Sequence, residues 1–360
     1  MRTRGLRPED LSPPLLAWFD RARRDLPWRR TRDPYRIWVA EVMLQQTQVE
    51  RVIPYYHRLV EAFPSIRALA AGSLDDLLRV WAGLGYYARA RNLHSACRLA
   101  VEKHAGRFPD CYADAMALPG VGEYIAGAVL SIAYGHKLPA IDANARRVLS
   151  RVLLERGDGS ARSRRRIESV ARAAMPADRP GDYNQAMMEL GALICLPRRP
   201  RCGDCCVASC CAAKLAGRQR EVPAVRRRGT RRGRVTVGVV WRRGRILIAQ
   251  RPPHGLWGGL WEFPNAELDR EHDAQAALEH LLARDFGITA AVGGIVAALT
   301  YGIMNRQLDL TAYSCTGVSG RTKARRHAHA RWVRPQELAL YALPAPHGRI
   351  ATVVAEAAVG

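Results

Sequence analysis

Two short stretches decide the fold of this chain: Leu118-Pro119-Gly120-Val121-Gly122 and, after an intervening apolar segment, Ile141-Asp142-Ala143-Asn144. The first lies between two segments with helical periodicity. Its glycines allow a tight turn, and the exposed backbone N–H groups there, with the N-terminus of the next helix, can approach a phosphate. The second stretch puts an acid at the start of a helix. A plain turn between helices is the alternative interpretation of the first stretch taken alone.

The chain around these stretches is predicted to be all-α from Ser12 to about Cys211. Ser12 followed by Pro13 is typical of a helix start, and Ser73 with an acid three residues later resembles a capping box. We expect 36–61 to be mostly helical and broken by Pro54.

The pattern changes after residue 211. Residues 217–234 are basic with little to bury, which favours a linker that is either a solvated tether or lies along a phosphate backbone. From Val235 apolar residues recur every second position, with Arg243-Gly244 as a turn, and 273–286 reads as one amphipathic helix. The sequence therefore predicts a multidomain chain, with an all-α domain at 1–216, a basic linker at 217–233 and an α+β domain at 234–360.

The chain is strongly basic, with 56 Lys and Arg against 33 Asp and Glu and a net charge of +23. Such a charge attracts polyanions, nucleic acid above all, although a genome that favours Arg codons is an alternative source of part of it. No run of 18 uncharged apolar residues occurs, so we expect no membrane span. The first ten residues lack the apolar stretch of a secretory signal, so a cytoplasmic location is expected.

Six of the nine cysteines lie between Cys195 and Cys211. In a reducing compartment a dense cysteine cluster indicates a metal or iron–sulfur site rather than disulfides. Four of them follow the pattern C-x6-C-x2-C-x5-C, in which each thiolate binds one iron of a cubane cluster. The predicted cluster ligands are Cys195, Cys202, Cys205 and Cys211. The competing interpretation is a zinc site made from Cys202, Cys205, Cys206 and Cys210.

Glu41 lies inside the apolar run Ile37–Leu44. Burial would raise the pKa of its carboxyl group, which suits a general acid near neutral pH. The plainer interpretation is a glutamate at the edge of a helix face with an arginine partner.

Longer motifs resemble the MutY-type adenine DNA glycosylases of the helix-hairpin-helix glycosylase superfamily, and they occur in that family's order. The turn lies within a helix-hairpin-helix element at about 114–134, and the cysteine spacing is similar to the 4Fe–4S loop (195–211) of endonuclease-III and MutY glycosylases. The motifs are Leu26–Arg29, Glu41–Val49, Gly83–Asn92, Asn184–Ala192 and, in the second domain, Arg251–Pro264, which resembles a Nudix-like domain.

The resemblance implies a catalytic role for four residues. Glu41 matches the general acid that protonates N7 of a flipped adenine, and Asp142 matches the carboxylate that stabilises the oxocarbenium-like sugar, as in glycoside hydrolysis. Asn144 matches a residue that supports the acids, and Tyr124 matches a Tyr or Ser beside the sugar carboxylate. Because bifunctional relatives carry a Schiff-base lysine at the position of Tyr124, we expect base excision without strong β-lyase activity.

The resemblance also implies residues that bind the base and the DNA. Because the target base leaves the stack, wedge residues are needed, and Gln46 and Tyr86 match them. Without the motifs, Trp28 reads as a core residue and Tyr86 as a surface aromatic. The implied base-binding residues are Trp28, Arg29, Leu44, Gln46 and Gln185, and the implied DNA-binding residues are Gln45, Tyr86, Gly120, Val121 and Gly122.

The second domain is predicted not to be a diphosphatase. Leu281 and Arg284 stand where Nudix hydrolases need metal-binding glutamates. In the family this domain inspects 8-oxoguanine on the opposite strand, commonly with a Phe-Ser-His tripeptide. Here Ile303-Met304-Asn305 occupies that place, so Met304 and Asn305 are the implied opposite-base residues, with Asn305 able to hydrogen-bond the base.

Together these expectations describe a monofunctional DNA glycosylase that excises adenine mispaired with 8-oxoguanine or guanine in base excision repair. Its partner is double-stranded DNA containing the mispair, its cofactor is a 4Fe–4S cluster, and it works as a monomer on the nucleoid. The alternatives are a glycosylase for another mismatch, such as thymine opposite guanine, and a damage sensor that does not cut.

Overall fold

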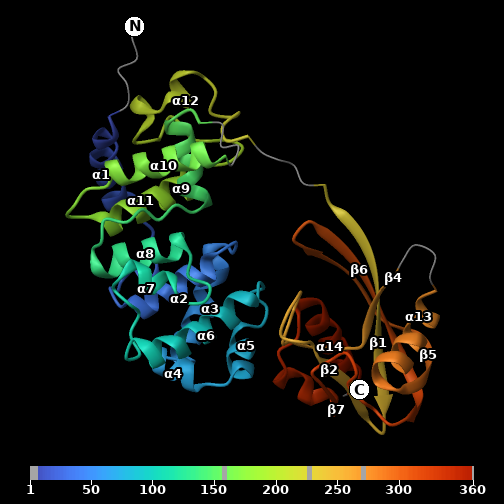
Figure 1. Cartoon of the computed structure of the whole chain (residues 1–360). Helices are drawn as coiled ribbons and strands as arrows, with labels where there is room; N and C mark the ends of the chain where they lie inside the picture. The colour runs from blue at the N-terminus through green and yellow to red at the C-terminus, as the bar shows by residue number, and fades with distance from the viewer. Residues whose placement is uncertain (1–6, 156–159, 225–228, 269–272, 359–360) are drawn as a thin grey trace. The chain divides into compact units, whose positions relative to one another are not determined.

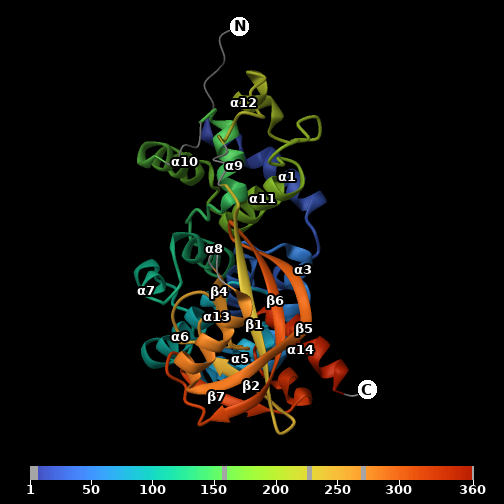
Figure 2. The same cartoon turned by 90° about the vertical axis from the view of Figure 1, so that its right-hand side faces the viewer.

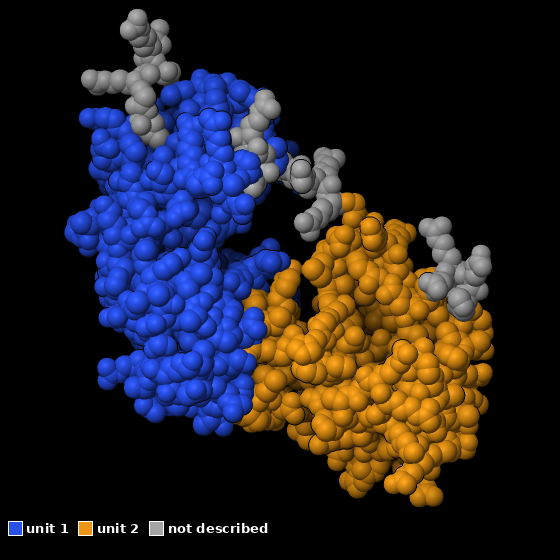
Figure 3. All heavy atoms as spheres, in the orientation of Figure 1, with its two compact units in different colours: residues 1–71, 92–226 blue, residues 72–91, 227–360 orange. Residues whose placement is uncertain are grey.

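The computed structural model describes residues 7–155, 160–224, 229–268 and 273–358. The chain forms two compact units, residues 1–71 with 92–226 and residues 72–91 with 227–360 (Figure 3). Residues 72–91 thus group with the C-terminal part, whereas the predicted helical domain included them. Residues 225–228 of the predicted linker lie outside the described part. The exact domain limits stay a prediction.

The first unit is helical, as predicted (Figure 1). Its central helices α2 and α8 pack on each other. α2 begins where the Asp33 side chain accepts a hydrogen bond from the Tyr35 N–H at 2.9 Å, followed by Pro34. The helices are α1 (Ser12–Ala22), α2 (Pro34–Leu44), α3 (Val49–Ala62), α4 (Ile66–Ala71), α6 (Ala88–Lys103), α7 (Tyr112–Met116), α8 (Glu123–Tyr134), α9 (Ala143–Val152), α10 (Ala161–Ala174), α11 (Pro180–Leu193) and α12 (Ala212–Leu215); α6 begins in the second unit.

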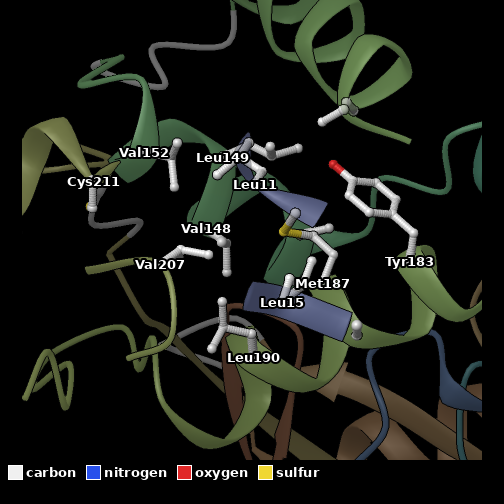
Figure 4. Packing of buried hydrophobic residues seen from close by; sticks show 14 of the residues in the cluster. Leu11, Leu15, Val148, Leu149, Val152, Tyr183, Met187, Leu190, Val207 and Cys211 are labelled. Carbon is white, nitrogen blue, oxygen red and sulfur yellow. The ribbon is translucent and has the colours of Figure 1, made fainter. Parts of the chain in front are cut away.

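One large core of this unit joins distant parts of the chain. Leu15 of α1, Val148 of α9 and Leu190 of α11 meet there with Cys211 (Figure 4). The segment that carries the cysteines is therefore packed against the same apolar core as the helix that begins at Asp142.

The expected break at Pro54 is wrong. Pro54 lies inside α3, and the helical run is interrupted at residues 45–48 instead. Pro54 stands near the start of α3, where its missing N–H costs one backbone hydrogen bond. α2 ends at Leu44 with Gln45 as its C-cap, and Gln46 follows with a φ of 57°, which no α-helix accommodates.

The described residues of the second unit contain a seven-stranded mixed sheet in the order β3-β2-β1-β6-β5, with β4 paired to β1 and β7 paired to β2. β1 and β6 run parallel and the other pairs antiparallel. Arg243 and Gly244, both at positive φ, form the predicted two-residue turn. The elements are α5 (Leu74–Trp81), β1 (Arg231–Arg242), β2 (Arg245–Gln250), β3 (Trp261–Glu262), β4 (Asn265–Leu268), α13 (Ala274–Leu281), β5 (Ile288–Ile303), β6 (Arg306–Gly320), β7 (His329–Val333) and α14 (Ala345–Ala357).

Helices cover both faces of this sheet (Figures 1 and 2). Successive residues of a strand point to opposite faces, so Val239 and Val240 of β1 enter different cores. Val239 packs in the core that contains Ile350 of α14, and Val240 in the core that contains Leu278 of α13. The unit is the expected α+β domain. The helix predicted over 273–286 is α13, capped by the Asp273 side chain, continued by a π-helical turn at Leu282–Phe286.

Candidate active site

A cavity of about 1150 Å³ lies in the first unit and brings the sequence-predicted catalytic residues together. Its walls come from the 26–29 loop, the end of α2 with the break that follows it, the starts of α8 and α9, and the C-terminal half of α11. The predicted residues that line it are Glu41, Asp142, Tyr124, Asn144, Trp28, Arg29, Leu44, Gln45, Gln46 and Gln185.

Glu41 is buried on the inner side of α2, with 4% of its surface exposed. Burial raises the pKa of its carboxyl group to about 7, and the negative charge of Asp142 acts in the same direction. A hydrogen bond from Tyr124 and the charge of Arg29 lower this pKa and oppose the shift in part. A carboxyl group that is half protonated near neutral pH has the property that a general acid needs.

Tyr124, in the first turn of α8, donates a hydrogen bond from its hydroxyl group to Glu41 Oε2. The same hydroxyl lies 3.3 Å from the sulfur of Met188 on α11. The family resemblance implies that Tyr124 lies beside the sugar carboxylate, Asp142, whereas its hydrogen bond goes to Glu41. Burial raises the pKa of the Tyr124 hydroxyl most, and the negative charges of Glu41 and Asp142 raise it further.

Asp142 is the N-cap of α9, where its side chain accepts a hydrogen bond from the Ala145 N–H at 2.6 Å. Asn144 Nδ2 donates to the other carboxylate oxygen at 3.0 Å. Burial raises the pKa of Asp142 above its ordinary value, and these hydrogen bonds oppose the shift in part. Both oxygens are thus held by donors, which favours the ionised form relative to Glu41.

Hydrogen bonds continue from Asp142 toward the cysteines. The Asn144 side-chain oxygen accepts from Arg147 at 2.8 Å, and Arg147 Nε donates to the carbonyl of Cys195 at 2.8 Å. Arg147 also donates to the Gly191 carbonyl at 2.7 Å. Sequence reasoning did not find Arg147, which falls one helical turn after Asn144 on α9 and so on the same face.

The predicted base-binding loop rests on a buried ion-pair cluster that sequence reasoning also missed. Glu189 of α11 is 1% exposed and accepts two hydrogen bonds from Arg29, both at 3.0 Å, and two from the Arg24 side chain, at 3.0 and 2.8 Å. Burial would raise the pKa of Glu189, but the hydrogen bonds from both arginines outweigh it and lower the pKa to about 2. Glu189 lies inside the motif 184–192, and that motif was the available signal.

Trp28 is nearly buried, at 5% exposed, and its ring meets Tyr56 edge-on with centroids 5.3 Å apart. It is a core residue that also lines the cavity, and its contact with a base stays a prediction. Gln46 reaches the cavity from the positive-φ break after α2. An aromatic wall and amide groups from Gln46 and Gln185 suit a planar, hydrogen-bonding base.

The predicted hairpin connects α7 to α8. Gly120 has a φ of 77°, and a Cβ there would come within 2.7 Å of the Asn92 Cβ, so glycine is required. Gly122 precedes the first turn of α8 with open space around its Cα. The hairpin does not line the cavity among the described residues. Gly120, Val121 and Gly122 therefore stay predicted contacts to the DNA backbone, separate from the base pocket.

Tyr86 and the opposite-base residues belong to the second unit. Tyr86 is 43% exposed and has a φ of 50°. Met304 and Asn305 form the turn between β5 and β6, and Met304 is 81% exposed with a φ of 53°. All three are accessible, and no described contact tests their predicted roles.

The four cysteines predicted as cluster ligands line one pocket, whereas Cys206 and Cys210 do not line it. In the described residues, no three Cys, His, Asp or Glu side chains are grouped as ligands of a single metal ion. A tetrahedral zinc needs its sulfurs about 2.3 Å from one metal, while a cubane spreads four sulfurs over separate irons. The residues that line this pocket include the whole predicted cluster set, whereas two members of the alternative zinc set lie outside it.

Arg151 of α9 also lines this pocket and is 2% exposed. It donates to Cys195 Sγ at 3.2 Å and to the carbonyls of Leu196 at 2.7 Å and Pro197 at 2.8 Å. Its described partners are neutral carbonyls and this sulfur, so a buried cation faces the cysteines without a carboxylate. Four thiolates around iron would supply the missing negative charge.

Comparison with known proteins first defines the class. The HhH-GPD superfamily of base excision DNA repair proteins matches residues 39–173, and the NUDIX domain matches residues 236–352. A solved structure titled "Structure of a thermostable thymine-DNA glycosylase" aligns over 58% of this chain and 97% of its own, with 27% identity and a TM-score of 0.55. These matches confirm the expected helical and Nudix-like domains.

Curated relatives define a narrower family within this class. The adenine DNA glycosylase of Buchnera aphidicola (subspecies Baizongia pistaciae) is 34% identical over 256 residues, covering 69% of this chain and 72% of that protein. The human adenine DNA glycosylase is 37% identical over 317 residues, covering 72% of this chain. The chain belongs to the adenine DNA glycosylase family. The match spans 58% of the human and 63% of the mouse relative's length.

No helix in the part of the chain that the structure describes has the length and apolar character needed to cross a bilayer.

Proposed function

We propose that this chain is a monofunctional DNA glycosylase that excises adenine opposite 8-oxoguanine or guanine in double-stranded DNA. The observation that carries the proposal is the pair Glu41 and Asp142 on one cavity, with different environments. Glu41 is buried, with its pKa raised to about 7, while Asp142 is held by two donors. Environments that separate two carboxyl groups assign one as acid and the other as anion.

Glu41 protonates N7 of the flipped adenine, which makes the base a good leaving group. Asp142 stabilises the positive charge that develops on the sugar as the N-glycosidic bond breaks. Asn144 keeps Asp142 oriented, and Tyr124 holds Glu41. Trp28, Arg29, Leu44, Gln46 and Gln185 surround the base, and Glu189 fixes the guanidinium of Arg29.

The DNA partner is bound around this cavity. The hairpin at Gly120, Val121 and Gly122 contacts the backbone through N–H groups at the start of α8, where the helix dipole favours an anion. Gln45 and Tyr86 contact the distorted duplex, while Met304 and Asn305 face the opposite base. Because its substrate is chromosomal, the protein works on the nucleoid, as a monomer.

Cys195, Cys202, Cys205 and Cys211 hold a 4Fe–4S cluster. Their common pocket and the uncompensated charge of Arg151 support this set over one that includes Cys206 and Cys210. The cluster supplies a covalent cross-link between the ends of an irregular loop. Arg147 and Arg151 fasten the first cysteine of that loop to α9.

The test is single-turnover excision on duplexes that pair adenine with 8-oxoguanine, guanine and cytosine, with a thymine–guanine duplex alongside. We expect release of adenine from the first two and little from the others. Preferential release of thymine would make the chain a glycosylase for that mismatch. Tight binding without release from any duplex would make it a damage sensor.

The monofunctional assignment has its own test. Tyr124 carries no amine for a Schiff base, so borohydride should trap little covalent adduct with substrate DNA. Efficient trapping on the wild-type protein would contradict this assignment without affecting the choice of base.

A further inference from the structure

An arginine-rich strand end in the second unit has no role in the proposed chemistry. Arg231, Arg232 and Arg234 are exposed at the start of β1. Among the described residues, no ion pair or hydrogen bond engages their side chains. Three unpaired guanidinium groups within four residues repel one another, and a polyanion would relieve that repulsion. We call these three residues the β1 edge.

Pairing with β6 holds the β1 edge in place along its length. β6 runs parallel beside it, with Arg231 next to Arg306 and Arg234 next to Asp309, and on the other side Arg234 pairs with Leu268 of β4. The Arg231 N–H also donates to the Asn305 carbonyl at 2.9 Å. The edge therefore moves as one rigid piece with the Met304–Asn305 turn, at the end of the sheet opposite the β1–β2 turn (Figure 1).

In the part of the second unit that the structure describes, nearby acids do not neutralise the β1 edge. Glu267 forms an ion pair with Arg306, and these two groups pack over Gly233. Asp309 accepts a hydrogen bond from Thr300 at 2.7 Å and forms no ion pair with Arg234 within 4.0 Å. Among the described residues, the three arginines thus outnumber the one nearby carboxylate that forms no ion pair, that of Asp309.

The spacing suits a phosphate backbone. Arg232 and Arg234 point to the same face of the sheet, two residues apart, which is roughly 6.6 Å along a strand. Two long side chains at that separation can each contact a different phosphate. The planar guanidinium makes bidentate hydrogen bonds to phosphate oxygens.

We propose that the β1 edge binds the sugar–phosphate backbone of duplex DNA beside the Met304–Asn305 turn. The proposal rests on the proposed function for its choice of DNA as the polyanion. Contacts to phosphate position a protein on the duplex without reading sequence, while groups that reach a base edge give specificity. The β1 edge therefore contributes affinity that does not depend on the opposite base.

The experiment measures affinity against salt for the full chain. Arg231→Gln, Arg232→Gln and Arg234→Gln are combined, and the matched control combines Arg162→Gln, Arg164→Gln and Arg165→Gln, which are exposed on α10 and remove the same charge. Both are made with Glu41→Gln so that substrate is not consumed. The probes are an undamaged duplex and duplexes that pair adenine with 8-oxoguanine or guanine.

For the β1-edge variant we expect the slope of log K against log salt to become shallower by about 2 to 3, since each lost phosphate contact contributes about 0.9. The affinity at low salt should fall about tenfold on all three duplexes alike. The control triple should change the slope by less than about 1. Replacement of the same three arginines by lysine should restore the slope, which separates charge from folding.

An unchanged slope, an equal change in the control triple, or a loss confined to the 8-oxoguanine duplex would each overturn the proposal. So would failure of the lysine variant to restore the slope, or stronger binding of vesicles containing phosphatidylserine than of duplex DNA. Excision is read separately with Glu41 intact. Wild-type protein that binds with the expected slope and releases no base would defeat the proposed function and leave the β1 edge standing.

Discussion

The hydroxyl of Tyr124 donates a hydrogen bond to the carboxylate of Glu41, so that α8 directly controls the acid carried by α2. This bond favours the ionised form of Glu41, whereas burial favours the protonated form, and burial has the larger effect. The pKa of about 7 is therefore a balance between two named causes.

Replacement of Tyr124 by phenylalanine removes the hydrogen bond that lowers the pKa of Glu41. We expect the pKa of Glu41 to rise above its wild-type value, because a hydrogen bond to the charged form is lost. If Glu41 must be protonated to act, the alkaline fall in single-turnover excision rate will move to higher pH. A pH–rate profile measures this directly, and an unmoved alkaline limb would count against Glu41 as the acid.

Replacement of Glu41 by glutamine should reduce excision by at least about 100-fold, which is the usual contribution of a general acid, and leave mismatch binding near wild type. Stability gives an independent readout. The pKa of Glu41 is raised from 4.5 to about 7 in the folded state, so wild type loses stability as pH rises between these values.

Glutamine removes that pH dependence. The two pKa values differ by an amount equivalent to roughly 3 kcal/mol, so the variant's melting temperature should exceed that of wild type more at pH 8 than at pH 5. Parallel pH dependence of the two melting temperatures would show that Glu41 is not buried as described.

Glu41, Asp142 and their meeting on one cavity were predicted from different signals in the sequence. The apolar run around Glu41 indicates burial, and the Asp142 cap follows from local helix signals, but their meeting on one cavity was implied by the family motifs alone. The interruption at Gln46 was missed, because nothing in a Leu-Gln-Gln-Thr sequence indicates a positive φ. Pro54 is a visible signal, but it lies inside α3 without ending it. Glu189 was missed because its arginine partners lie 160 and 165 residues away.

Gly191 on α11 supports the site by its lack of a side chain. A Cβ there would lie 2.6 Å from the Asn144 Cβ and 3.0 Å from the Asn144 backbone. Gly191→Ala should therefore displace Asn144 from Asp142 and lower the excision rate by about 100-fold, as small misplacements of catalytic groups do. Gly348→Ala, which meets open space on α14, is the control. Wild-type rates in both variants would contradict the role of the close approach.

Glu189 is expected to matter for stability as well as for the base pocket. Glu189→Gln leaves Arg29, whose side chain is 13% exposed, without its counter-charge, and breaking a buried pair costs about 3 kcal/mol or more. Chemical denaturation measures the loss. Glu221→Gln, which breaks an exposed pair with Arg218, should cost less than about 1 kcal/mol. Equal effects of the two changes would contradict the burial of the first pair.

The cysteines divide into two groups with different expected outcomes. Cys205→Ser should yield protein without the brown colour of an iron–sulfur cluster and with iron content well below four per chain, the number in a cubane. Cys206→Ser with Cys210→Ser should keep colour and iron, because neither lines the pocket. Loss of metal in the double variant, with zinc in the wild type, would support the alternative ligand set.

The pairing of Arg24 with Glu189 also constrains how the protein is made. These partners are 165 residues apart, and Ser12 bonds to the Ala174 carbonyl across a similar span. As the chain leaves the ribosome, the N-terminal helix and the loop that carries Trp28 must wait for α11 before their contacts form. Long sequence separations between contacting residues slow folding. The proposed base pocket is thus completed only after nearly the whole first unit has been synthesised, and a nascent chain that ends before α11 lacks one wall of the cavity.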